Sequence, residues 1–396
     1  MKTNHRKNLY ILAFSLIVVM LGFGIVIPIM PFYVERLGAG GTELGLLVAS
    51  YAVMRLICGP LWGSFSDRVG RKPVLMVGIF GYGITMILFG LATKLWMLFL
   101  FRALSGILSS ATSPTTMAYI GDSTPEKERS QGMGVLGAAV GVGTIFGPGL
   151  GGLLAGENLA TPFFIAGGMS FFALLLIWLF LPESLPEATR LGTGGKKRLT
   201  AREMWQAASG SIGSLLFMAF LTSFGLTSFF GIFGLYALQK FSAGPEAVGG
   251  IIMVFGVVTA LAQGMLVGPL TRNWGEKRVI QIGLISTAAG FLFIALSNSF
   301  ITFLVSIGLF TLAIAVLSPA VSALTSSLTT LEQGLTMGLS NAAQSLGRIA
   351  GPLLGGIVFD ISLEYPNYLG AIVMGIGFVI SLFTLTQVRA GVMEAK

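Results

Sequence analysis

GRIAGPLLGG at residues 347–356 and GTIFGPGLGG at residues 143–152 share one pattern, G-x-x-x-G-P-x-x-G-G, and lie 204 positions apart. A second pair of segments, GSFSDRVGRK at 63–72 and GPLTRNWGEK at 268–277, aligns with an offset of 205. Two independent pairs with nearly the same offset indicate a chain built from two repeated halves. Only the second copy of the first pattern carries an arginine, Arg348, inside an apolar stretch.

The composition indicates that both halves lie in a membrane. Of the 396 residues, 54% are hydrophobic and 10% are charged, whereas a soluble domain would be about one quarter charged. A helix needs about 20 apolar residues to cross a bilayer. Twelve such stretches occur, at about 9–31, 44–62, 74–92, 97–119, 132–155, 162–181, 213–236, 247–267, 279–296, 300–320, 337–359 and 367–387. We predict an all-α membrane protein with twelve transmembrane helices in two pseudo-symmetric six-helix bundles.

The longest connection between these stretches divides the chain. It is polar and basic, and GTGGKKR at 192–198 has the composition of a flexible linker. We therefore predict an N-terminal bundle over residues 1–181, a cytoplasmic linker over 182–212 and a C-terminal bundle over 213–396. We do not expect the first stretch to be a cleaved signal peptide, because it is too long and no small-residue cleavage site follows it.

The distribution of basic residues predicts the orientation. Eighteen of the 24 Lys and Arg residues fall in tails and loops on one side, and three (Arg36, Lys94 and Lys240) fall in loops on the other. Cytoplasmic loops carry the excess of Lys and Arg. Both termini are therefore expected in the cytoplasm of a bacterial-type cell, with the chain in its inner or plasma membrane. The net charge of +8 is explained by this topology, without nucleic-acid binding.

Several chemistries are disfavoured by what the chain lacks. It contains one cysteine, Cys58, and one histidine, His5, so an internal disulfide, a zinc site or a haem site is not expected. No Walker phosphate loop occurs, so ATP is not expected to drive the protein directly. We predict no cofactor, no metal and no enzymatic activity.

The motifs resemble those of the major facilitator superfamily along the whole chain. GSFSDRVGRK after the second span is similar to the signature loop of that superfamily, and RALSG at 102–106 to the arginine motif of its drug exporters. GTIFGPGLGG in the fifth span resembles the antiporter motif. LGFGIVIPIMP at 21–31 resembles the first span of the twelve-helix drug:proton antiporters, the group of the bacterial multidrug and tetracycline exporters. The resemblance implies alternating access to a midplane site between two repeated halves.

The repeated glycine pattern has two interpretations. Glycines at this spacing give helices a smooth face for close packing, and a proline within a helix bends or softens it. We favour gate helices, built on Gly143, Gly147 and Pro148 in the fifth span and on Gly351 and Pro352 in the eleventh, over packing alone.

The turn at 63–72 also has two interpretations. It is a charged turn, or, as the resemblance implies, Asp67 and Arg71 form a cytoplasmic latch. Arg272 stands where the second half would need the equivalent of Asp67, so we expect the latch to work mainly from the first half.

Two arginines are predicted near mid-bilayer. A charge there costs about 2.5–3.5 kcal/mol on insertion scales and indicates function by default. Arg55 shares a helix face with Tyr51, and Arg348 shares one with Asn341 and Gln344. We predict that both faces line the substrate cavity. The alternative is hydrogen bonding between helices.

Aromatic residues of the seventh span, including Phe224 and Phe230, are expected to add an adaptable apolar cavity wall. Most phenylalanines of this span are expected to serve as packing or lipid contacts.

The acidic residues complicate proton coupling. All sixteen Asp and Glu residues map to loops, tails or span ends, and the acidic residue of the tetracycline exporters in the first helix is absent. Arginine keeps its proton, so a carrier would have to be a carboxylate near a span end. We predict Glu35 and Asp360 as the candidate proton carriers, with Arg102 modulating Glu35. The alternative is that Arg102 and Glu35 are two exposed charges near the membrane surface that do not interact.

The predicted function is export of amphipathic drug-like molecules by proton antiport. Because the predicted cavity carries arginines and no carboxylate, we expect it to favour neutral or anionic compounds. The alternative is a carrier, exchanging or facilitating, for an anionic or neutral metabolite. The expected partners are a small-molecule substrate, protons and the lipid bilayer, with no nucleic acid, and we expect a monomer.

Overall fold

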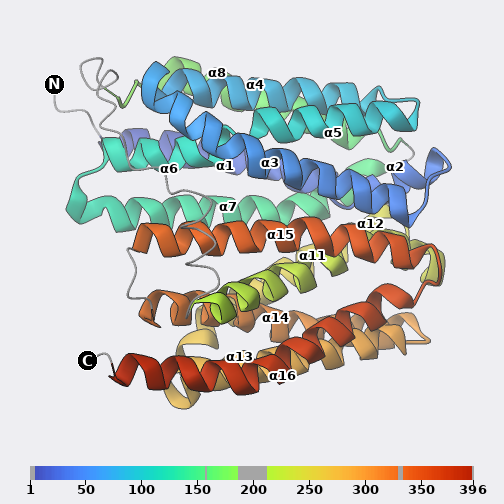
Figure 1. Cartoon of the computed structure of the whole chain (residues 1–396). Helices are drawn as coiled ribbons and strands as arrows, with labels where there is room; N and C mark the ends of the chain where they lie inside the picture. Colours follow the sequence, from blue (N-terminus) through green and yellow to red (C-terminus); the bar gives the residue numbers. More distant parts are fainter. Residues whose placement is uncertain (1–4, 157, 186–211, 329–332, 395–396) are drawn as a thin grey trace. The chain divides into compact units, whose positions relative to one another are not determined.

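The computed structural model describes residues 5–156, 158–185, 212–328 and 333–394. In the labels of Figure 1, its helices are α1 (His5–Val26), α2 (Met30–Arg36), α3 (Gly41–Val69), α4 (Arg71–Gly90), α5 (Leu95–Ser109), α6 (Thr112–Ser123), α7 (Glu126–Ala155), α8 (Thr161–Phe180), α11 (Gly213–Phe241), α12 (Pro245–Met265), α13 (Val267–Ala295), α14 (Phe300–Leu328), α15 (Gln333–Phe359) and α16 (Tyr365–Glu394).

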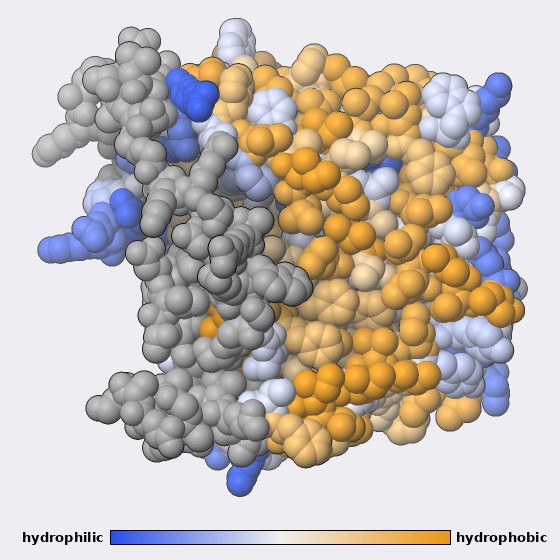
Figure 2. Space-filling view, in the orientation of Figure 1, coloured by the Kyte–Doolittle hydropathy of each residue, from blue (hydrophilic) through white to orange (hydrophobic). Residues whose placement is uncertain are grey.

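Eleven segments among the described residues are long and apolar enough to cross a membrane. The pair α1–α2 and the pair α5–α6 each form one of them. Helix α15, at the predicted eleventh span, is not among the eleven, because polar residues such as Arg348 lower its hydropathy. Figure 2 shows apolar side chains over much of the visible face, with hydrophilic ones mainly at its left and right ends. Side chains such as Ile301 and Phe383 are about 70% exposed, as lipid-facing residues should be.

The chain divides into two compact units. Of the described residues, unit 1 contains 5–39, 50–156, 158–185 and 243–254, and unit 2 contains 40–49, 212–242, 255–328 and 333–394. Each unit therefore includes a short segment from the other sequence half, the start of α3 in unit 2 and the start of α12 in unit 1. The predicted bundle boundaries differ by these two segments. Most of the predicted linker, residues 186–211, lies outside the described residues.

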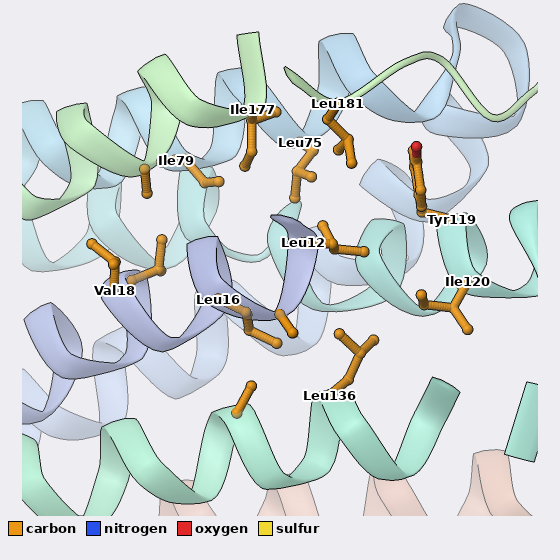
Figure 3. Close-up of a cluster of buried hydrophobic side chains, with 14 residues drawn as sticks. Leu12, Leu16, Val18, Leu75, Ile79, Tyr119, Ile120, Leu136, Ile177 and Leu181 are labelled. Atoms are coloured by element: carbon orange, nitrogen blue, oxygen red, sulfur yellow. The ribbon is translucent and has the colours of Figure 1, made fainter. Parts of the chain in front are cut away.

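The core of unit 1 lies among α1, α4, α6, α7 and α8. Figure 3 shows side chains of these helices pointing into one space, including Leu12 of α1, Leu75 of α4 and Leu136 of α7. Tyr119 of α6 is fully buried there, and its hydroxyl donates to the carbonyl of Pro182 at 2.8 Å. This contact anchors the end of α8 to α6.

Unit 2 is built on close pairs of helices, α11 with α15 and α13 with α14 and α16. Gly290 of α13 allows one of these approaches, since a Cβ there would lie 3.0 Å from the Cα of Phe310. Phe310 is fully buried and contacts Phe291, with ring centroids 4.8 Å apart.

The same glycine turn occurs in both halves. Gly70 has φ 119° and precedes α4, and Gly275, 205 positions later, has φ 75° inside α13. Side chains other than that of glycine are strained at such angles. The repeated signature segments therefore form equivalent breaks, as the aligned sequences predict.

Candidate functional site

An arginine–tyrosine cluster lies inside unit 1. We define it as Phe23 of α1, Tyr51 and Arg55 of α3, Tyr82 of α4 and Arg102 of α5. The guanidinium carbon of Arg102 lies 4.4 Å from the centroid of the Tyr51 ring, and that of Arg55 lies 5.6 Å from the same centroid. Phe23 contacts both tyrosine rings, with centroid distances of 5.9 and 6.4 Å. Two cations thus share one aromatic ring.

The close approach of α5 to α3 positions this cluster. A Cβ at Gly106 would lie 2.9 Å from the carbonyl oxygen of Tyr51, so only glycine fits without a shift. Arg102 lies one turn before Gly106 on the same face of α5, which brings its side chain onto Tyr51. The hydroxyls of Tyr51 and Ser109 are 3.1 Å apart and hold the two helices together. The RALSG motif therefore places the arginine through its glycine.

Arg102 is a buried cation without a carboxylate partner. Arg102 is 7% exposed, and its Nε has no hydrogen-bond partner. The hydroxyls of Tyr82 and Ser105 are buried and also without a partner. Among the described residues, neither Arg102 nor Arg55 forms an ion pair. Cation–π contact offsets part of the cost of removing the guanidinium from water. A buried guanidinium without a counterion can donate two parallel hydrogen bonds to one carboxylate.

The predicted pairing of Arg102 with Glu35 is absent from the structure. Glu35 lies at the exposed end of α2, whereas Arg102 is buried against Tyr51. The physical reason is the Gly106 contact, which aims Arg102 toward α3. Arg55, predicted to be a mid-bilayer cavity residue, is exposed on α3.

The predicted latch residues Asp67 and Arg71 form an ion pair at 2.6 Å. Arg71 makes more contacts than the sequence indicated, because its Nε also donates to Asp122 at 2.8 Å and its Nη1 to Ser66 at 2.6 Å. Glu183, just after α8, accepts hydrogen bonds from the backbone N–H groups of Arg71 and Lys72 at 2.9 and 3.1 Å. Arg71 therefore links the ends of α3, α4 and α6 within unit 1.

Sequence reasoning missed Asp122 and Glu183 as partners of Arg71. A sequence signal existed for each, since both are acidic residues at the end of a predicted span on the basic side of the membrane. Their pairing with Arg71 depends on how α3, α4, α6 and the end of α8 pack, which the sequence alone does not indicate.

The glycines of α7 form two packing faces in unit 1. A Cβ at Gly147 would lie 2.7 Å from the Cα of Gly24, and one at Gly143 would overlap Met20, so this face fits α1. On the other face, the carbonyl of Pro148 is covered by Gly249, and α7 there contacts the start of α12. Close packing is thus present on both faces, and the gate role remains a prediction.

The glycines of α15 repeat this arrangement in unit 2. A Cβ at Gly351 would lie 2.6 Å from the hydroxyl of Thr227, and that hydroxyl donates to the carbonyl of Gly347 at 3.2 Å. Pro352 packs on Gly231 of α11, and its carbonyl is covered by Gly45 at the start of α3. Gly45 and Gly249 are 204 positions apart, so the crossing of helices repeats with the sequence pattern.

Asp360 caps α3. Its two carboxylate oxygens accept hydrogen bonds from the backbone N–H groups of Gly41 at 2.7 Å and Thr42 at 2.8 Å. Burial raises the pKa of Asp360, but the hydrogen bonds from Thr42 and Gly41 outweigh it, so the pKa lies below its ordinary value. The ionised form of Asp360 is therefore the form that caps α3, and its role in proton coupling remains a prediction.

The polar stripe of α15 is hydrogen-bonded along the helix. Arg348 donates to Gln344 through a long contact of 3.4 Å, and Gln344 donates to Ser340 at 3.4 Å. Arg348 and Asn341 are exposed. Their assignment to a cavity wall remains a prediction.

The two phenylalanines assigned to the cavity wall differ in placement. Phe224 is 2% exposed and its ring stacks on Phe220, so it lies in the interior of unit 2, and its assignment to a cavity wall remains a prediction. Phe230 is half-buried and contacts Phe255 edge to face at 4.6 Å. A phenylalanine cluster, which we define as Phe229, Phe230, Phe255 and Phe310, forms around it.

A second network missed by sequence reasoning lies at the far end of α11. Lys240 pairs with Glu364 at 2.8 Å, and the Tyr236 hydroxyl donates to Glu364 at 2.9 Å. Lys240 also donates to the carbonyl of Ala295 at 3.0 Å, which ties α11 to the end of α13. The described residues contain no group of three or more His, Cys, Asp or Glu side chains that could hold a metal ion.

Comparison with known proteins agrees with this architecture. The chain is 32% identical over 382 residues to multidrug resistance protein 2 of Bacillus subtilis, with 96% of each chain covered. It is 26% identical to the quinolone resistance protein NorA of Staphylococcus aureus, covering 98% of this chain and 99% of that protein. The crystal structure of the human organic anion transporter MFSD10 has the same fold, with a TM-score of 0.68 at 22% identity, covering 96% of this chain and all of that one.

A family model settles the classification. The model described as Major Facilitator Superfamily matches residues 12–213 and 215–392, almost the whole chain. The predicted resemblance and the predicted twelve-helix transporter fold are confirmed. The chain belongs to the major facilitator superfamily.

Proposed function

We propose that this protein exports amphipathic small molecules by proton antiport with alternating access, and that it favours neutral or anionic compounds over cations. Two of its relatives are named for multidrug or quinolone resistance, which supports the exporter role. The substrate preference rests on the arginine–tyrosine cluster of unit 1.

The observation that carries the preference is the buried, unpaired Arg102. A lipophilic cation near Arg102 and Arg55 would meet like charge in a medium of low dielectric constant, where repulsion is strong. A carboxylate would instead supply the missing counterion and hydrogen-bond acceptors. Binding of an anion would therefore offset the desolvation cost of the buried guanidinium.

Proton coupling is proposed to use a carboxylate at a span end. Glu35 is exposed at the end of α2, whereas Asp360 is engaged as the cap of α3 with a lowered pKa. We therefore favour Glu35 over Asp360 as the proton carrier. The asymmetric distribution of Lys and Arg supports a plasma-membrane location with both termini in the cytoplasm.

A carrier for an anionic metabolite is the second candidate. The same unpaired Arg102 supports it, and the fold also serves the organic anion transporter MFSD10. The two candidates differ in whether a pH gradient drives net movement.

Transport by purified protein in liposomes tests the proposal. We would impose a pH gradient and follow one anionic, one neutral and one cationic fluorescent amphiphile, using wild type, Arg102→Gln and the control Arg272→Gln. The proposal expects gradient-driven movement of the anionic and neutral probes, loss of anion movement in Arg102→Gln, and normal activity in Arg272→Gln. Movement that ignores the gradient would favour the metabolite carrier, and cation transport that survives Arg102→Gln would exclude the proposed preference.

A further inference from the structure

An apolar groove of about 400 Å³ lies in unit 2, between α13 and α14. Its lining includes Val279, Ile282, Ser286 and Phe293 of α13, and Leu312 and Ala313 of α14. Apart from Ser286 and Trp274, the lining side chains carry no polar atoms. Ile282 and Phe293 are 46% and 51% exposed, so the groove opens on the surface of unit 2.

The two halves differ at this place in the helix packing. In the first half, Leu108 of α5 fills the equivalent position, and a Cβ at Gly81 would lie 2.6 Å from the Cβ of Leu108. At the offset of 205, Ser286 corresponds to Gly81 and Ala313 to Leu108. Because the alanine side chain has three fewer carbons than that of leucine, α14 leaves space at the position that Leu108 of α5 fills.

The length and position of the groove fit a lipid chain. Val279 and Phe293 are fourteen residues apart on α13, which corresponds to about 21 Å along a helix. The hydrocarbon core of a bilayer is about 30 Å thick, so the groove is longer than one leaflet is deep. Helix α13 is among the segments apolar enough to span the membrane.

One end of the groove carries groups suited to a lipid headgroup. Leu270 and Trp274 line this end, and Trp274 is 48% exposed. Arg278 is exposed and lies one turn before Ile282 on the same face of α13. It forms no ion pair among the residues that the structure describes. Tryptophan and arginine at a span end suit the headgroup level of a bilayer, and each basic group there attracts anionic lipid.

We propose that this groove binds one anionic phospholipid, with an acyl chain along α13 and α14 and the phosphate held by Arg278 beside Trp274. The charge of Arg278 selects an anionic headgroup over a zwitterionic one. The site depends on membrane insertion of α13 and α14, and it is independent of what the protein transports.

Native mass spectrometry of the delipidated full-length protein tests the site. Phosphatidylglycerol and phosphatidylcholine would be titrated onto wild type, Ala313→Leu, Arg278→Gln and Arg272→Gln. Arg272 is the matched control, because it is exposed and lies on the opposite side of α13 from Leu270 and Trp274, two residues from each in the part of the helix before Gly275. Wild type should retain one phosphatidylglycerol, bound at least fivefold more tightly than phosphatidylcholine. Ala313→Leu and Arg278→Gln should each weaken that binding at least fivefold, and Arg272→Gln less than twofold.

Three results would overturn the proposal. Equal affinity for the two lipids would remove the headgroup selection, and unchanged binding in Ala313→Leu would place the lipid elsewhere. Displacement of the lipid by a transported amphiphile, with transport lost in Ala313→Leu, would make the groove a substrate site. Ser286→Leu fills the same groove from α13 and replaces Ala313→Leu if that variant does not fold.

Discussion

The arginine–tyrosine cluster of unit 1 and the phenylalanine cluster of unit 2 come from equivalent parts of the two halves. At an offset of 205, Ile307 corresponds to Arg102, and at 204, Phe255 corresponds to Tyr51. Ile307 is an apolar side chain that is 4% exposed. Arg102 is 7% exposed, and its Nε lacks a hydrogen-bond partner. The same fold thus accommodates an ordinary core in one half and an unpaired cation in the other.

The comparison separates residues that specify the fold from residues that are candidates for binding a ligand. Both halves share the glycines of the tight turns and the prolines of α6 and α14, Pro114 and Pro319, which are 205 positions apart. These residues specify backbone geometry in each half. Unit 2 has Ile307 at the position equivalent to Arg102, so the repeated helix arrangement does not depend on a charge at this position. A charge retained at such a cost is best explained by a ligand that compensates it.

The largest effect is expected from giving unit 1 the side chain of unit 2. Arg102→Ile removes a buried charge without a counterion, so the variant should be more stable to heat than wild type. It also removes the anion-binding group, so transport of an anionic amphiphile should fall at least tenfold. Thermal unfolding in detergent and transport in liposomes measure the two effects. A destabilised variant with normal transport would show that Arg102 serves the fold.

A smaller effect is expected from the cap of α3, which also has no equivalent in the other half. Gly156 stands at the position equivalent to Asp360, and α12 begins at Pro245, which has no N–H to cap. Asp360→Ala should lower the stability of the protein by about 1 kcal/mol, a typical cost for losing a helix cap. Asp360→Asn should lose less, because its amide oxygen still accepts a hydrogen bond.

The pH dependence of this effect follows from the lowered pKa of Asp360. The stabilisation is present above the ordinary Asp pKa of about 4 and is lost as the pH falls through the lower pKa of the folded state. The stability difference between wild type and Asp360→Ala should therefore stay constant from about pH 5 to pH 8 and shrink in stronger acid. A difference that changes between pH 5 and pH 8 would contradict the assigned ionisation and restore Asp360 as a proton carrier.

The smallest effect is expected from Tyr51→Phe, which copies Phe255. The ring that both arginines contact is kept, and only the hydroxyl contact with Ser109 is lost. Because a typical hydrogen bond contributes about 1 kcal/mol, we expect anion affinity to change less than about fivefold. Tyr51→Leu removes the ring and should weaken anion affinity further. Equal affinities of the two variants would exclude the cation–π contact as a support for Arg102.

The repeated fold was predictable from the sequence because glycines, prolines and the lengths of apolar stretches determine local backbone structure and membrane insertion. The duplicated pattern around Gly147 and Gly351, and the apolar stretches, needed no three-dimensional information. The partners of charged residues were harder, because they depend on how helices pack. Arg102 was assigned to Glu35 from depth alone, and the Gly106 contact that turns it toward Tyr51 appears only in the structure. The burial of Phe224 likewise depends on helix packing, and its assignment to the cavity wall remains a prediction.

Equilibrium binding of a matched ligand pair tests the central claim most directly. The pair is an amphipathic aromatic carboxylate and its methyl ester, which differ in the ionised group alone, titrated by calorimetry into wild type and Arg102→Gln. We predict that wild type binds the carboxylate at least tenfold more tightly than the ester, a difference of about 1.4 kcal/mol, and that the two ligands bind equally to the variant. A wild-type protein that prefers the ester, or a carboxylate preference that persists in Arg102→Gln, would contradict the account.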